Sequence, residues 1–315
     1  MEHLYKNLII AIVFFLVGAL EANAQGCIAI RSGCGVNIGG GTLMPKGSWQ
    51  AGTNLRYFHS YKHFRGKHEE THRVQEGTEV INDSYFVDLT LLYALSDRFA
   101  VNMILPFVYH ERSSMYEHGG NPPSGLGDRH KTYSQGLGDI RVGVTYWMLD
   151  PEQSTTNFSL GLALKAPSGN YRATSTFYNQ GENRDQIIQS GVDQSIQPGD
   201  GGFGLAIESQ GFHVLTDNLL LSGNLYYLIN PREKYSIENR GRTRDYSVAD
   251  QYAGRLGISY MTLVHGLGLY GGFRFEGIPS SDLIGGDEGF RRPGYIVSME
   301  PGLSYNFNNF SLNIT

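Results

Sequence analysis

Nine charged residues stand out because each lies in a short run where apolar residues alternate with small or polar ones. They are Arg56, Asp88, Arg141, Lys165, Glu208, Arg255, Arg274, Glu276 and Glu300. Charges that line a pore set the electric field that a permeating solute meets. The alternative is that they pair with one another and fill a narrow interior. Because both signs are present, we expect no strong ion selectivity.

A second set of residues that could do chemistry, here by binding a metal ion, is the histidine series His59, His63, His68 and His72. Residues 68–72 read His-Glu-Glu-Thr-His, which matches the H-E-x-x-H pattern of zinc proteases. That pattern works on a helix, where both histidines share one face. Here it lies in a charged run between two alternating segments, so we expect no protease site. The series stays a candidate for a surface metal ion, with a solvated loop as the alternative.

A nucleophilic pair is the third kind of chemistry to weigh. A barrel hydrolase needs a serine and a histidine on one strand face, with a polar group that orients the histidine. His110 and His213 lie in alternating runs, and the spacing predicts no serine partner for either. The sequence shows no phosphate loop or nucleotide fingerprint. We therefore expect no enzymatic activity and no cofactor.

The N-terminus predicts export. Lys6 supplies a positive charge, and residues 8–20 form an apolar stretch that is short for a membrane span. Residues 22–24 (Ala-Asn-Ala) form a small-x-small cleavage site, so 1–24 is expected to be a secretory signal peptide. An uncleaved anchor is the alternative. In an oxidising periplasm, Cys27 and Cys34 are expected to form a local disulfide, and two free thiols are the alternative.

Composition limits the class of protein. The chain has 315 residues, a length that suits one large barrel or two ordinary domains. It holds 41 glycines and 20 tyrosines, and its mean hydropathy is -0.28, so a helical membrane protein is not indicated. The formal net charge of -5 argues against a nucleic-acid partner.

The hairpin expected at residues 135–169 shows how the charged residues are positioned. Apolar residues occupy every second position on both sides of a break near Asp150, which predicts two strands with one apolar face. The other face carries Arg141 and Lys165 among Gly, Ser, Thr and Ala, and we expect these two residues to be neighbours across the hairpin. A soluble sheet buries its apolar face, whereas a membrane barrel turns that face to lipid and its polar face to a wet lumen.

Eleven segments of this kind run from Trp49 to the end of the chain. Short connections fall near Asp97, Asp150, Asp217, His265 and Asn308, and long ones follow Tyr61, His110, Pro167, Ile229 and Gly277. Alternating short and long connections are typical of outer-membrane barrels. Because such barrels have an even strand number, we expect an all-β, transmembrane, antiparallel up-and-down barrel of about 12 strands, with the C-terminal strand missing. A soluble β-sandwich or barrel is the alternative.

Two short motifs flank the hairpin. Gly136-Leu137-Gly138-Asp139 precedes its first strand, and Leu164-Lys165-Ala166-Pro167-Ser168-Gly169 ends its second. They resemble the outer-membrane β-barrel transporter family associated with the meta-pathway of phenol degradation. The likeness extends from about Tyr85 to the end of the chain, in pattern more than in identity. It implies a barrel and the passage of small aromatic or apolar molecules, and it supplies no catalytic residues.

The sequence thus predicts a signal peptide (1–24), a Gly-rich periplasmic lead-in (25–47) and an outer-membrane barrel (48–315) of a Gram-negative bacterium. The expected function is a channel or transporter for small solutes. Alternatives are a surface binding or adhesion barrel that acts through its long loops, and a barrel enzyme. Expected partners are outer-membrane lipid, small solutes and the barrel-assembly machinery, with no nucleic acid.

Overall fold

The structure is a computed structural model that describes residues 44–66, 68–120, 129–150 and 154–315. The expected signal peptide and the Cys27–Cys34 pair lie outside these ranges, as does most of the expected lead-in at 25–47.

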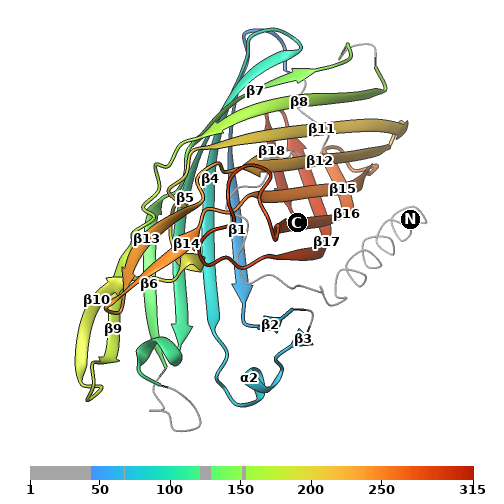
Figure 1. Cartoon of the computed structure of the whole chain (residues 1–315). Helices are drawn as coiled ribbons and strands as arrows, with labels where there is room; N and C mark the ends of the chain where they lie inside the picture. Colours follow the sequence, from blue (N-terminus) through green and yellow to red (C-terminus); the bar gives the residue numbers. More distant parts are fainter. Residues whose placement is uncertain (1–43, 67, 121–128, 151–153) are drawn as a thin grey trace.

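One large antiparallel sheet forms the body of the molecule, and it curls so strongly that β4 and β5 cross the direction of β8 and β11 (Figure 1). Its main strands are β1 (Trp49–Ser60), β4 (Ile81–Ala94), β5 (Phe99–Ser114), β7 (Arg141–Trp147), β8 (Thr156–Lys165), β11 (Gly204–Thr216), β12 (Leu219–Ile229), β15 (Gln251–Met261), β16 (Leu267–Ile278), β17 (Gly294–Phe307) and β18 (Phe310–Ile314). Each strand pairs with the next one in this series. The eleven expected segments and the up-and-down order are thereby confirmed.

The alternation in the sequence places different residues on the two faces of this sheet. On β8, Leu162 and Leu164 are 53% and 67% exposed, while Ala163 and Lys165 between and after them are 3% and 2% exposed. An apolar outer face and a small or charged inner face are the reverse of a soluble sheet. We call the space enclosed by the inner face the lumen.

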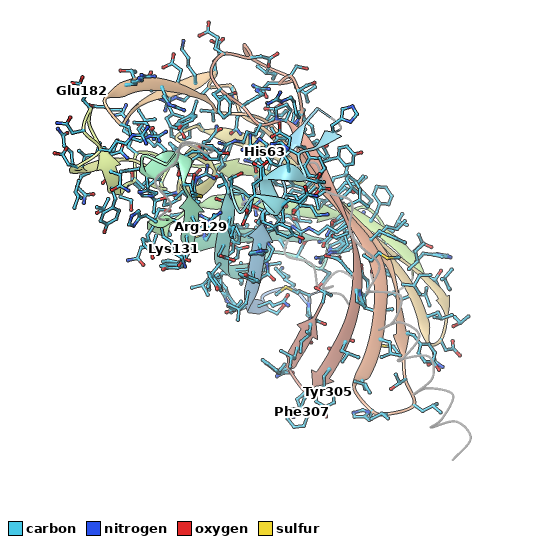
Figure 2. The ribbon with its side chains drawn as sticks, turned by 90° about the horizontal axis from the view of Figure 1, so that it is seen from below. His63, Arg129, Lys131, Glu182, Tyr305 and Phe307 are labelled. Carbon is cyan, nitrogen blue, oxygen red and sulfur yellow. The ribbon has the colours of Figure 1, made fainter. Side chains whose placement is uncertain are left out.

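Tight turns join the strands at one end of the sheet, here called the turn end, and long connections join them at the other, the loop end. Figure 2 shows Tyr305 and Phe307 beside a tight turn, far from His63, Arg129 and Lys131 at the loop end. On the outer face near the loop end, four tyrosine rings form a row from β1 to β6. They are Tyr57, Tyr85, Tyr109 and Tyr133, with neighbouring centroids 5.0, 6.1 and 6.5 Å apart. Such a row is typical of the aromatic girdle at a membrane surface.

The wall is interrupted between β5 and β8. The turn-end half of β5 pairs with β7, whereas its loop-end half pairs with β6 (His130–Leu137). β6 and β7 are thus one strand with a break at 138–140. The long connection expected directly after His110 is shorter than predicted, because β5 continues to Ser114 and β6 begins at His130.

The remaining long connections also hold ordered structure. They contain the short pair β2 (Phe64–Arg65) and β3 (His68–Glu69), the helix α2 (His72–Gln75), the hairpin β9 (Thr174–Gln180) and β10 (Gln186–Gly191), and the hairpin β13 (Lys234–Asn239) and β14 (Arg242–Ser247). Two single turns of 3-10 helix, η1 (Tyr116–His118) and η2 (Gln194–Ile196), complete them. In Figure 1 the two hairpins lie beside β6 at the loop end. Tyr235 and Tyr246, from opposite strands of the second hairpin, are buried and form part of an apolar cluster there.

Among the residues that the structure describes, no helix is both long and apolar enough to cross a membrane.

Candidate functional site

The largest group of predicted charges meets on the lumen side of β15, β16 and β17. Arg255 and Arg274 lie directly opposite each other on β15 and β16. Opposed like charges on neighbouring strands destabilise a sheet. Glu300 of β17 relieves this repulsion, because its carboxylate lies 2.5 Å from Arg255 Nε and 4.0 Å from Arg274 Nη1. Glu276, two residues beyond Arg274 on the same face, accepts from Arg274 Nη2 at 2.5 Å.

Glu276 also connects this group to the first strand. Arg56 on β1 donates to Glu276 Oε2 through Nη1 at 3.3 Å, and its guanidinium stacks over Phe86 of β4, 4.6 Å from the ring centroid. β1 and β16 are not neighbours in the sheet. An ion pair between them therefore reaches from one part of the wall to another across the lumen. We call Arg56, Glu276, Arg274, Glu300 and Arg255 the lumen chain.

A second, smaller group lies on β7, β11 and β12. Arg141 is 1% exposed, and its Nη1 donates to Glu208 Oε1 at 3.4 Å. The same guanidinium lies over the ring of Tyr226, 5.1 Å from the centroid. Arg141 and Lys165 are direct cross-strand partners, as the hairpin predicted. The nearby carboxylate and aromatic ring offset the cost of burying the arginine.

Lys165 takes its partners from the break in the wall. Its ammonium forms an ion pair with Asp200 and lies 3.9 Å from Asp139 Oδ2. Asp139 also accepts from the backbone amides of Gly169 at 3.0 Å and Asp200 at 3.0 Å. A side chain on Gly169 would collide with Gly199, because a Cβ there would lie 2.7 Å from the Gly199 Cα. The motifs at 136–139 and 164–169 therefore build a tight junction between three chain segments.

Asp88 is the exception among the nine predicted residues. It lies on the lumen face of β4, is 7% exposed, and within the described ranges makes no ion pair. Eight of the nine residues are thus brought into three groups: seven pair among themselves, and Lys165 pairs with Asp200, which lies outside the predicted set.

A further charged group lies at the loop end, and the sequence did not predict it. Asp193 receives two hydrogen bonds from Arg292, at 2.5 and 2.8 Å, and its carboxylate lies 3.8 Å from Arg112 Nη2. Arg112 is on β5 and also pairs with Glu117 at 3.0 Å. Burial alone would raise the pKa of Asp193, but Arg112 and Arg292 together hold that pKa well below its usual range. We call Asp193, Arg292, Arg112 and Glu117 the mouth group.

Sequence signals for the mouth group were weak. Arg112 continues the alternation of β5, and recognition that β5 extends beyond His110 would have placed its side chain in the lumen. Asp193 and Arg292 lie in connections without periodicity, 99 residues apart. Nothing in their local sequence indicates that they meet.

The histidine series does not assemble into a metal site in the described residues, which hold no group of three or more His, Cys, Asp or Glu suited to a metal. His59 Nδ1 lies 2.7 Å from Asp83 Oδ1, and His63 Nε2 lies 3.6 Å from Glu70 Oε2. His68 is in the two-residue strand β3, and His72 begins the four-residue helix α2. The H-E-x-x-H residues therefore do not share a helix face, and a surface metal ion stays a prediction that zinc titration can test.

The expectation that His110 lacks a serine partner is wrong. His110 Nδ1 lies 2.9 Å from Ser84 Oγ. The register through the tight turn pairs Ala94 with Ala100 and, ten residues further on each strand, Ser84 with His110. Counting outward from the turn would have found this pair. Both side chains are almost fully buried, at 3% and 1% exposure.

A cavity of about 1250 Å³ adjoins the lumen chain. Its lining includes Arg56, Asp88, Arg274 and Glu300 together with Phe58 and Phe86. Charged and aromatic side chains thus share one hollow on the inner side of the sheet.

Comparison with solved structures agrees with this architecture. An outer membrane channel from Pseudomonas putida F1 matches with a TM-score of 0.52 and 15% identity, over 84% of each chain. A FadL homologue from Pseudomonas aeruginosa matches with a TM-score of 0.46 and 11% identity, over 84% of this chain and 65% of the other. The toluene transporter TodX of Pseudomonas putida matches with a TM-score of 0.41 and 11% identity, over 82% of this chain and 70% of the other. The first of these matches shows that the fold is that of an outer-membrane barrel.

A comparison with protein families covers most of the chain. The model of a protein family that is described as "MetA-pathway of phenol degradation" matches residues 38–315. This agrees with the resemblance carried by the motifs at 136–139 and 164–169. The chain therefore belongs to the family of the MetA-pathway of phenol degradation.

Proposed function

We propose that the protein is an outer-membrane channel that lets small solutes pass through its lumen, with the loop end outside the cell and the turn end in the periplasm. One observation carries the proposal: an apolar face turned outward and a charged face turned inward on the same strands. This arrangement suits lipid on one side and water on the other. It has no use in a soluble sandwich, where the apolar faces would pack together.

Residues of both signs line the proposed path. The lumen chain contains three arginines and two glutamates, and Arg141 with Glu208 adds one of each sign. Most of these charges are compensated, so the field along the path is weak compared with that of a ring of one sign. We therefore expect a general channel with little preference between anions and cations.

The proposed solutes are small aromatic or apolar molecules. The family description refers to phenol degradation, and aromatic side chains lie on the lumen face beside the charges. Phe58 and Phe86 line the cavity, and Tyr226 packs under Arg141. Flat aromatic rings pack favourably against such side chains.

Reconstitution of the refolded full-length protein tests the proposal. Planar-bilayer recordings should show stepwise channel currents, and liposomes that carry the protein should take up phenol faster than empty liposomes. The lipid-facing variant Leu162→Arg serves as a control, because a charge on that face hinders insertion. A folded, inserted barrel without current or solute flux would contradict the channel.

The surface-binding alternative rests on the ordered hairpins at the loop end. Deletion of the β13–β14 hairpin separates the two functions. Loss of ligand binding to whole cells, in a protein that never supported flux, would favour a binding barrel. Preserved flux after the deletion would favour the channel.

A further inference from the structure

The connection between β10 and β11 differs from an ordinary loop because it is enclosed. Residues 192–202, here called the strap, contain no β-strand, yet Val192, Ile196 and Gln197 are 0% exposed. Connections usually run over the surface, because their backbone groups need water as a partner. In the strap, side chains of the surrounding wall take that role. Ser134 of β6 donates to the carbonyl oxygen of Ile196, for example.

Contacts of the strap reach one strand of the wall and two segments of the loop end that are far from it in the sheet order. On one side, Arg112 of β5 donates to Ser195 Oγ at 3.3 Å. On the other, Gln194 Nε2 donates to the carbonyl oxygen of Ser247, the last residue of β14, at 2.7 Å. Arg292, just before β17, donates to Asp193. In the sheet order six strands separate β5 from β17, so the strap spans the loop end of the lumen.

Two aspartates anchor the strap at its ends. Asp193 lies in the mouth group between Arg112 and Arg292, and Asp200 pairs with Lys165 at the junction with β8. The anchor at Asp200 is close to where the strap enters β11 at Gly204, so chain connectivity keeps that end in place. The anchor at Asp193 is held by Arg112 of the wall strand β5 and by Arg292 in the connection before β17. Its release would remove the ionic link to the segment before β17 and leave the Gln194–Ser247 hydrogen bond as the contact described on that side, while the other end stays attached.

We propose that the strap is a closed lid over the loop-end mouth of the channel and that Asp193 is its latch. The latch holds because one carboxylate satisfies two arginines, one from β5 and one from the connection before β17. When it is removed, Arg112 and Arg292 repel each other and the strap loses its link to the segment before β17. The inference rests on the proposed channel function, since a lid requires a path to close.

The first experiment uses the full-length protein with Asp193→Asn. This variant keeps the shape of the side chain and removes the charge that the two arginines share. We expect single-channel conductance or open time to rise at least about threefold over the parent protein, because a gate of this kind controls access to the pore. Glu182→Asn, at the exposed tip of the β9–β10 hairpin, is the control and should leave both values unchanged.

The second experiment fixes the strap. Gln194→Cys and Ser247→Cys are introduced together into the Asp193→Asn protein, with Cys27→Ser and Cys34→Ser to remove the native thiols. A short reducible bis-methanethiosulfonate reagent then links the new pair. We expect the link to return conductance to the parent level and reduction to restore the increase. The same link between Ser236→Cys and Asp245→Cys, which face each other within the β13–β14 hairpin, should have no effect.

The outcomes separate the two proposals. An Asp193→Asn protein that is folded by circular dichroism and conducts like the parent would overturn the latch. So would an increase that survives the Gln194–Ser247 link, because the strap would then not be the moving part. If neither parent nor variant conducts, the channel function itself fails, and the latch fails with it.

Discussion

The lumen chain and the mouth group use the same chemistry on different supports. In both, carboxylates are shared between arginines whose side chains are largely buried. All five residues of the lumen chain lie on strands whose backbone is held by ladder hydrogen bonds. In the mouth group, Asp193 and Arg292 lie in connections.

This difference indicates that the effect of removing a shared carboxylate depends on whether its residues lie on strands or in connections. On rigid strands, loss of the carboxylate leaves the arginines where they are, and the free energy of unfolding falls. In connections, loss of the carboxylate allows the two segments to move apart, so the conformation changes. The predictions below test that division, from the largest expected change to the smallest.

Glu276→Gln is expected to have the largest effect on stability. It removes the carboxylate that Arg56 and Arg274 share, and two poorly hydrated guanidinium groups remain nearly in place. We expect a loss of about 3 kcal/mol in the free energy of unfolding, at the lower end for a broken buried pair, because the lumen admits some water. Urea unfolding of the protein in lipid vesicles measures it. Glu182→Gln should unfold like the parent, and a loss at Glu276 below about 1 kcal/mol would refute the rigid-support argument.

Asp200→Asn should cost less, because Lys165 has a second carboxylate. Asp139 lies 3.9 Å from the lysine and remains after the change. We expect a loss of roughly 1–2 kcal/mol, below that of an unshared buried pair. The double variant Asp139→Asn/Asp200→Asn should lose more than the sum of the single variants. Simple additivity in urea unfolding would show that the two carboxylates act independently.

The pH dependence of the mouth group should be flat in the physiological range. The pKa of Asp193 is depressed in the folded protein, so its contribution is complete above the pKa of an unfolded aspartate, about 3.9, and is lost only as pH falls below it. The charged groups around it are Arg112, Arg292 and Glu117. Conductance should stay constant from about pH 8 to about pH 5 and rise below about pH 4. A rise near neutral pH would identify a histidine as the controlling group instead.

Lys131→Ala should have the smallest effect. Lys131 pairs with Glu111 on the outer face at the loop end, where its side chain is 49% exposed. Exposed pairs contribute little because water screens them. We expect a change below about 0.5 kcal/mol in urea unfolding. A cost equal to that of Glu276→Gln would mean that position in the lumen adds nothing to a charge pair.

The wall of the barrel could be predicted from the sequence because the alternation within each strand shows which residues face lipid and which face the lumen. Alternation and one short connection predict that Arg141 and Lys165 are cross-strand neighbours, and the structure confirms this pairing. The same reasoning placed the remaining seven charges on the inner face. Local periodicity is sufficient where the physical cause, lipid on one side and water on the other, acts on every second residue.

The loop end could not be predicted in this way. Asp193 and Arg292 come into contact only because of how two connections fold in three dimensions. No repeating pattern in either segment indicates this contact. Ser84 and His110 are an intermediate case. Their pairing was available from the register of one tight turn, but it required counting across the turn rather than inspection of a single strand.

The opposed arginines on β15 and β16 have a consequence for biogenesis. The β15–β16 hairpin alone carries Arg255, Arg274 and Glu276 on its inner face and is left with one excess positive charge. Glu300 arrives only with β17 and balances it. The three-stranded unit, rather than either hairpin, is therefore the smallest set of paired strands in this wall without a net inner charge. We therefore expect the charges on the inner face to favour joint insertion of β15, β16 and β17 into the bilayer.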